Sequence, residues 1–303
     1  MKGIKKYSLF LFILLALLYG IQFAIDQAYK HRCTDKVSLL MKHQVDAQLM
    51  VFGSSVAYVQ FDAAVIGQET GLSAYNMGWD GVFFVQYNGI IKEFLSYETQ
   101  CKYLVIACDF DNLGKNNLIT RPDMYYAYMK NDNIYQSLHD IEPAKMFKAK
   151  YLPGYRFTIL GKTFYNHFLN GKKDDSEING FRPRYVPWTG DSTVKKFDAR
   201  FDSDVYAKFR NTVNEIRKRN ISVFIVMPPV YKDGYDRILN SEEIKNRYRT
   251  LAGHGVYFMD YTHDSLCNDK SMFYNNSHLN GFGASIFSHK FATDIKAIIG
   301  NTK

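Results

Sequence analysis

One uncharged apolar segment near the amino terminus limits what this chain can fold into more than any other feature. The segment SLFLFILLALLYGIQFAI, residues 8–25, contains no charged side chain, and three lysines precede it. A helix of about 20 apolar residues spans the hydrocarbon core of a bilayer, and flanking lysines favour the cytoplasmic side. We therefore expect residues 1–33 to form a cytoplasmic tail and signal anchor, with residues 34–303 forming one extracytoplasmic domain.

A cleaved signal peptide is the alternative interpretation of this segment. The apolar run is longer than the apolar region of most signal peptides, and no clear Ala-x-Ala cleavage site follows it. Its length favours an uncleaved anchor. The expected location is the cytoplasmic (inner) membrane, with a single pass and the carboxyl-terminal domain outside the cytoplasm or in the periplasm.

The charge and the cysteines exclude several classes of function. The chain has a net charge of +8, but its Lys and Arg residues are scattered among acids instead of forming a basic stripe. This distribution argues against nucleic acid and favours a membrane surface or an anionic envelope polymer. The cysteines show no metal-binding spacing, so we expect no metal, no cofactor and at most one disulfide among Cys33, Cys101, Cys108 and Cys267.

Short apolar runs alternate with segments of helical periodicity along most of the chain. Buried strands are predicted within residues 49–52, 72–81, 102–108, 223–227 and 255–260. Helices are predicted within residues 35–44, 82–97, 205–216, 242–251 and 284–298. This alternation predicts an α/β fold with three layers, in which helices cover both faces of a parallel sheet. Functional residues of such sheets gather at the carboxyl ends of the strands.

Residues 114–191 interrupt this alternation with a mixture of aromatic, charged, Pro and Gly residues that follows no single period. Long insertions in α/β domains commonly form lids or binding surfaces. We expect this insertion to be a substrate or partner surface. Tyr155, Tyr185 and Trp188 are candidates for stacking against sugar rings, although ordinary packing also explains aromatic residues.

Two serines follow the first predicted strand at the turn into a helix. A serine in this position can present its hydroxyl to a carbonyl group while backbone N–H groups face the same point. Ser54 and Ser55 both have this position. The alternative is that one of them only caps the following helix.

One histidine has a setting that suits a catalytic base. His278 lies in the polar stretch MFYNNSHLNGFG, directly before the last predicted helix. This placement would bring its imidazole to the sheet edge that carries the two serines. As a structural residue it would need only a backbone hydrogen-bond partner.

Together these motifs resemble the SGNH or GDSL hydrolase superfamily, across most of residues 46–299. VFGSSVAY resembles the first block and implies that Ser55 is the nucleophile, with Ser54 where many members have Asp. YNMGWDG resembles the second block and implies an oxyanion donor at Gly78. CDFDNL stands in place of the third block without its usual Gly-x-Asn-Asp order, and makes Asn112 the candidate for the other donor.

FYNNSHLNGFGASIF resembles the last block, in which the family has Asp three residues before the His. Here that position is Asn275, whose amide oxygen can accept a hydrogen bond but carries no charge. The carboxylate of Asp260 or Asp264 could supply the missing acid, a Ser–His dyad could suffice, or the site could be degenerate.

Within the superfamily, the chain is similar to the membrane-anchored extracytoplasmic branch associated with membrane-bound O-acyltransferases. The resemblance implies a serine esterase or O-acyltransferase that acts on a cell-envelope polysaccharide, and polysaccharide, an acyl donor and a multi-span membrane O-acyltransferase as partners. The alternative is a catalytically degenerate SGNH-like protein that binds glycan or docks on a membrane acyltransferase.

Overall fold

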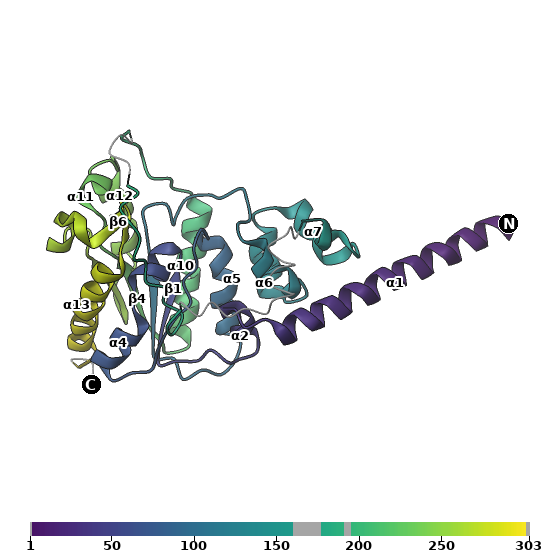
Figure 1. The fold of residues 1–303 in the computed structure, drawn as a ribbon, viewed down its shortest axis with the longest axis horizontal. Helices are drawn as coiled ribbons and strands as arrows, with labels where there is room; N and C mark the ends of the chain where they lie inside the picture. Colours follow the sequence, from purple (N-terminus) through teal and green to yellow (C-terminus); the bar gives the residue numbers. More distant parts are fainter. Residues whose placement is uncertain (1, 160–176, 191–194, 301–303) are drawn as a thin grey trace.

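A five-stranded parallel sheet forms the centre of the domain (Figure 1). The computed structural model describes residues 2–159, 177–190 and 195–300. In spatial order the strands are β2 (Ala74–Asn76), β1 (Leu49–Gly53), β3 (Tyr103–Ala107), β4 (Ser222–Met227) and β5 (Val256–Asp260). The predicted three-layer α/β architecture with a parallel sheet is therefore confirmed.

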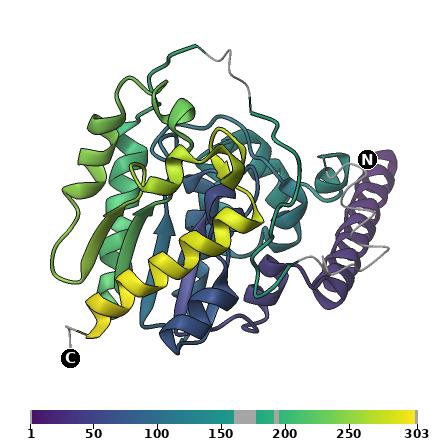
Figure 2. The ribbon, with the colours of Figure 1, turned by 60° about the vertical axis from the view of Figure 1, so that its left-hand side comes forward.

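Helices cover both faces of the sheet and create two hydrophobic cores. Alternate strand residues point to opposite faces, so Met50 and Phe52 enter one core while Leu49 and Val51 enter the other. The first core lies under α5 (Phe84–Phe94), α10 (Ser203–Lys218) and α12 (Ser241–Arg249). The second lies under α3 (Ser55–Gln60), α4 (Ala63–Thr70) and α13 (Gly281–Gly300), the last crossing the sheet in Figure 2.

The amino-terminal apolar segment forms one long helix, α1 (Lys2–Arg32), that projects from the domain (Figure 1). It is long and apolar enough to cross a membrane. Most of its described side chains up to Ile21 are exposed, whereas Gln22, Asp26 and Tyr29 are buried against the domain. Only the carboxyl-terminal part of α1 is therefore docked on the rest of the chain.

Lys36 attaches the end of this helix to the carboxyl edge of the sheet. It opens the short helix α2 (Lys36–Met41) and its side chain is almost fully buried. Its ammonium group donates to the carbonyl oxygens of Gly78 at 2.6 Å, Gly180 at 2.7 Å and Asn76 at 3.4 Å. Because a buried charge needs such partners, these contacts tie α2 to the loop after β2 and to residue 180.

The chain between β3 and α10 contains the irregular segment. Its first part forms the 3₁₀ turns η1 (Pro122–Met124) and η2 (Tyr126–Tyr128) and the helices α6 (Asp132–His139), α7 (Pro143–Tyr151) and α8 (Tyr155–Ile159). Helix α6 packs on α5, and α7 lies beside α1 in Figure 1. Residues 160–176 and 191 of the predicted insertion lie outside the described residues, and its last described part, residues 177–190, is extended.

Residues 177–190, which we call the strap, return across the carboxyl edge of the sheet. The strap begins beside β2, where the Asn76 amide donates to the Asn179 carbonyl at 2.9 Å. It ends at the hairpin of β6 (Phe273–Asn275) and β7 (His278–Leu279), where the Thr189 amide donates to the Tyr274 carbonyl at 2.7 Å. The last short elements lie near this edge: α11 (Lys232–Tyr235), η3 (Ser265–Asn268) and η4 (Lys270–Met272).

The three aromatic residues proposed for sugar stacking do not share one surface. Tyr155 belongs to α8 and lies under Lys148, while Tyr185 packs on Phe282 of α13. Trp188 packs edge-to-face on Tyr231 with their ring centroids 5.3 Å apart. The four cysteines are buried and unpaired, so none of them forms the single disulfide that the sequence allows.

Candidate active site

Ser55 follows the carboxyl end of strand β1, which lies between β2 and β3, and is the first residue of α3. The turn before it is tight, because a Cβ atom on Gly53 would lie 2.7 Å from the carbonyl oxygen of Ala107 on the neighbouring strand. Glycine at this position therefore lets the chain leave the sheet and turn directly into the helix. The Ser55 hydroxyl is consequently presented at the carboxyl edge of the sheet.

His278 reaches Ser55 from the other end of the sequence. The imidazole Nε2 lies 2.8 Å from Ser55 Oγ, across 223 residues of chain. The hairpin of β6 and β7 holds the histidine in place, and the ring of Tyr274 stacks on the imidazole with centroids 5.5 Å apart. The two residues that the sequence analysis paired are thus in hydrogen-bonding contact.

Asn275, His278 and Ser55 form a hydrogen-bonded chain of three residues, which we call the relay. The Oδ1 of Asn275 lies 3.0 Å from His278 Nδ1 and also accepts hydrogen bonds at 2.9 Å from the backbone amides of Ser277 and His278. Because an amide oxygen only accepts, the imidazole carries its proton on Nδ1 and leaves Nε2 free to accept from the Ser55 hydroxyl. This is the tautomer that a general base next to a serine requires.

Burial lowers the pKa of His278 from its usual 6.5 to about 4. The charge of Asp80 acts in the opposite direction and raises this pKa, while Arg184 lowers it. Asn275 adds no negative charge that would stabilise the imidazolium. The imidazole is therefore neutral, and able to act as a base, at neutral pH.

This pKa predicts an unusual pH dependence. Esterase activity that depends on neutral His278 should stay level from pH 7 to about pH 5 and fall only near pH 4. The folded state binds fewer protons than the unfolded state between the folded pKa of about 4 and the usual 6.5, so stability should decrease as pH falls through that window. Initial rates with a nitrophenyl ester and thermal unfolding, both against pH, test this. A loss of esterase activity with a midpoint near pH 6.5 would contradict the prediction.

The two carboxylates considered as substitutes for the missing acid are engaged elsewhere. Asp260 pairs with Lys245 at 3.2 Å and accepts from Thr262. Asp264 pairs with Lys290 at 2.7 Å and caps η3. The side-chain contact at His278 Nδ1 is Asn275 and neither of these groups. The hypothesis that Asp260 or Asp264 acts on His278 is therefore wrong in this conformation.

Gly78 does not have the geometry expected of an oxyanion donor. Its amide donates to Asn76 Oδ1 at 2.7 Å, and its carbonyl accepts from Lys36. A Cβ atom at this position would lie 2.5 Å from Ala57 Cβ and from the Tyr58 amide nitrogen. The glycine thus permits close packing of the loop on α3, and its N–H group is already used.

Asn112 is better placed for the predicted role. Its side chain is buried and lines the same cavity as Ser55 and His278. The Tyr87 hydroxyl donates to Asn112 Oδ1 at 2.7 Å, which fixes the amide orientation, and Nδ2 donates to Cys108 Sγ at 3.6 Å. The amides of Ser55 and Val56 add further donors, because the first turn of a helix offers them no intrahelical acceptor.

A cavity of about 390 Å³ opens beside the Ser55 hydroxyl. Aliphatic and aromatic side chains form much of its wall: Val56, Val82, Phe83, Phe110, Phe197, Val230 and Ile238. Ser55, His278 and Asn112 also line this cavity. A largely apolar wall beside a serine hydroxyl suits the acyl part of an ester.

The sequence analysis assigned no role to Asp109, which lines this cavity as well. Its carboxylate accepts from Ser54 Oγ at 2.9 Å and from the Asp111 amide at 2.9 Å. Burial raises the pKa of Asp109, and the Ser54 hydrogen bond partly opposes this. Ser54 therefore supports a half-buried acid that lines the same cavity as Ser55. Its position at the end of β3 was the only signal for Asp109 in the sequence.

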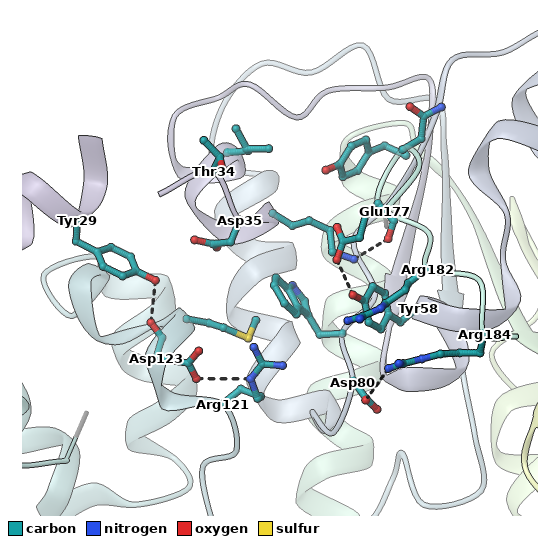
Figure 3. Close-up of a pocket in the computed structure, with 17 residues that line it drawn as sticks. Tyr29, Thr34, Asp35, Tyr58, Asp80, Arg121, Asp123, Glu177, Arg182 and Arg184 are labelled. Carbon is teal, nitrogen blue, oxygen red and sulfur yellow. Dashed lines mark hydrogen bonds and ion pairs between the residues drawn. The ribbon is translucent and has the colours of Figure 1, made fainter. Parts of the chain in front are cut away.

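A second cavity, of about 330 Å³, lies near the foot of α1 (Figure 3). Four acidic and four basic side chains line it, together with Tyr29, Tyr58, Tyr75 and Trp79. In Figure 3 Arg184 points toward Asp80, at 3.4 Å. The two charges of this pair also shift the pKa of His278, in opposite directions. Among the described residues, no group of three or more His, Cys, Asp or Glu could hold a metal ion.

Comparison with known proteins identifies no family for this chain. No family model matches the sequence, and no curated protein matches it. One similar solved structure is a protein from Streptococcus pneumonia provisionally named platelet activating factor, with 14% identity, a TM-score of 0.44, and coverage of 95% of this chain and 99% of the other.

A second is the acetyl xylan esterase Est2A from the rumen bacterium Butyrivibrio proteoclasticus, with 10% identity and a TM-score of 0.35. That match covers 83% of this chain and 64% of the esterase. At these levels of similarity the site residues are interpreted from their own geometry.

Proposed function

We propose that this chain is a membrane-anchored serine esterase or O-acyltransferase that acts on a cell-envelope polysaccharide. The observation that carries the proposal is the 2.8 Å contact between His278 Nε2 and Ser55 Oγ, with Nε2 unprotonated. The contact joins a strand-end serine to a base whose tautomer Asn275 fixes. This is the arrangement that nucleophilic acyl transfer requires.

The reaction follows from these contacts. His278 Nε2 takes the hydroxyl proton of Ser55 as Oγ attacks the ester carbonyl carbon, and Asn112 Nδ2 with the Ser55 amide stabilises the oxyanion. The imidazolium returns the proton to the departing alcohol, which leaves the acyl group on Oγ. A sugar hydroxyl or water then gives its proton to Nε2 and attacks the acyl carbon, and the imidazolium returns that proton to Ser55 Oγ as the acyl–oxygen bond breaks.

Two features support a bulky polar substrate next to the acyl pocket. The second cavity has equal numbers of acidic and basic side chains, which suits a neutral ligand with many hydroxyl groups better than a strong anion. The Nε1 of Trp79 and the hydroxyl of Thr34 are buried there and have no hydrogen-bond partner among the described residues. Sugar hydroxyls could satisfy both groups.

The location and the partner are part of the proposal. The apolar helix α1 would anchor the protein in the cytoplasmic membrane, with the domain on the extracytoplasmic or periplasmic side. The acyl donor and the polysaccharide would meet at Ser55. A multi-span membrane O-acyltransferase is the partner that would deliver acyl groups to such an anchored domain.

A serine-reactive fluorophosphonate probe tests the proposal. The full chain in phosphatidylcholine nanodiscs should be labelled, and Ser55→Ala should lose the label because the probe bonds to Oγ. Ser54→Ala is the matched control: its hydroxyl serves Asp109, so labelling should persist. Absent labelling of the wild type, or equal labelling of Ser55→Ala, would overturn the proposed function.

One observation favours a second function, a degenerate protein that binds glycan or docks on a membrane acyltransferase. Asn275 occupies the position of the acid, and within the part of the chain that the structure describes the side-chain hydrogen-bond partners of His278 are Asn275 and Ser55. Under this alternative the wild type would bind polysaccharide or co-purify with the acyltransferase equally well after Ser55→Ala. The Asn275 substitution discussed below separates the two functions.

A further inference from the structure

Helix α7 and the residues after it pack against a part of α1 that lies within the apolar span. The Tyr19 hydroxyl donates to the Tyr151 carbonyl at 2.5 Å. The Gly154 amide donates to Gln22 Oε1 at 2.9 Å. These contacts place the end of α7 alongside a helix segment that has no charged residue between Lys6 and Asp26.

The length of the apolar run indicates how deep in a bilayer these contacts would lie. A membrane-spanning helix needs about 20 residues, and 20 residues counted from the end of the lysine cluster at Lys6 reach Asp26. At about 1.5 Å per residue, Tyr19 lies roughly 10 Å and Gln22 roughly 6 Å inside that end of the span. The segment of the insertion that contacts them therefore lies at the same depth.

A buried ion pair lies on the carboxyl-terminal side of these contacts along α1. Arg156 pairs with Asp26 at 2.5 Å, and both side chains are almost fully buried. Gln22, Asp26 and Tyr29 recur at helical spacing on one face of α1, the face that meets the insertion. The polar side chains on this face of α1 are thus covered by protein.

The free side of α7 has the composition of a helix that lies in a membrane interface. Phe147, Tyr151 and Leu152 are 57%, 50% and 49% exposed. The rings of Phe147 and Tyr151 lie 4.9 Å apart, and Lys148 is exposed on the same helix. Met146 on the opposite side is fully buried in the domain. Apolar rings with neighbouring lysines are characteristic of helices that lie at the boundary between headgroups and acyl chains.

We propose that α7 is a second membrane contact, which inserts Phe147, Tyr151 and Leu152 among the lipids next to α1 while Lys148 meets the lipid phosphates. The inference rests on the membrane anchor of the proposed function. A single spanning helix would leave the domain free to rotate about the helix axis. A second contact beside it stops this rotation and fixes which side of the domain faces the bilayer.

Fluorescence quenching by brominated phospholipids tests the contact. The chain has two tryptophans, so Trp79→Phe with Trp188→Phe provides a silent background for one reporter. In nanodiscs whose lipids carry bromine near the headgroup end of the acyl chain, Phe147→Trp should lose about half of its emission, since interfacial helices insert to about 5–10 Å. Phe282→Trp, on α13 at the far end of the molecule from α1 in Figure 1, should lose none.

A third reporter tests the membrane anchor α1 separately from the α7 contact. Phe10→Trp lies on the exposed part of α1 and should be quenched wherever the anchor spans the bilayer. Quenching of Phe10→Trp without quenching of Phe147→Trp would overturn the α7 contact and leave the anchor intact. Failure of both reporters would overturn the anchor as well, and neither result depends on esterase activity.

A chemical measurement covers the case in which the tryptophan-free background does not fold. The four native cysteines are buried, so a single introduced cysteine can be followed with a charged maleimide. In nanodiscs, Phe147→Cys should react about tenfold more slowly than Phe282→Cys, because a charged reagent does not enter the lipid. The two parent side chains are similarly exposed in the protein, at 57% and 66%. Equal rates would overturn the contact.

Discussion

Asn275→Asp is expected to raise esterase turnover by about 10²-fold or more, since the reverse change in a serine-protease triad costs about 10⁴. The carboxylate can accept the same hydrogen bonds that Asn275 Oδ1 accepts from the Ser277 amide, the His278 amide and His278 Nδ1. The loop geometry should therefore persist. The added charge would stabilise the imidazolium and raise the pKa of His278 from about 4.

The esterase rate of the wild type distinguishes the two proposed functions. One outcome is a measurable wild-type esterase rate that increases in Asn275→Asp and decreases at a higher pH than in the wild type. This outcome supports an enzyme whose His278 works with an uncharged Asn275. A wild-type rate equal to that of Ser55→Ala, together with a large gain in Asn275→Asp, supports the degenerate alternative. Asn275→Ala is the control, because it removes the hydrogen bonds without adding charge. No gain in Asn275→Asp would contradict the role given to residue 275.

Ser55→Ala and His278→Ala should each lower kcat by about 10³-fold or more, and the double variant should lose no more than either single one. The reason is that the 2.8 Å contact makes the two residues one functional unit: Ser55→Ala removes the nucleophile, and His278→Ala removes the base that activates it. Rates with an activated ester, measured for the four proteins of this cycle, give the coupling directly.

A matched substitution controls for general damage to the site. Ser277 is exposed, neighbours His278 and lines the same cavity. Ser277→Ala should keep the wild-type kcat, because its contact with Asn275 runs through the backbone amide. Losses that add in the Ser55 and His278 double variant would show that the two residues act independently and would contradict the relay.

The sheet could be predicted from the sequence because each strand is a short buried run. Leu49–Gly53 and Ser222–Met227 are apolar almost throughout, and the helices between such runs show apolar residues at helical spacing. Parallel strands then bring their carboxyl ends to one edge. The contact between Ser55 and His278 follows from that topology together with the resemblance of their flanking motifs.

The direction of the Gly78 amide could not be predicted in the same way. A motif gives the residue at position 78 but not the direction of its amide, and here the Asn76 side chain takes that N–H. The partners of Asp260 and Asp264 depend on lysines from α12 and α13, which no local pattern reveals. The packing of residues 151–156 on α1 involves a segment without periodicity, so only the structure could show it.

The three carbonyl contacts of Lys36 have a mechanical consequence for any reaction at Ser55. Only Cys33, Thr34 and Asp35 separate α1 from α2, and the lysine fastens α2 to the loop that precedes Asp80. The domain is consequently not joined to α1 by a flexible linker. In the proposed membrane-anchored state it would therefore not sample a range of positions above the bilayer. Under the proposed function, Ser55 would lie at one fixed height above the bilayer, so the acyl donor and the polymer would both have to reach that plane.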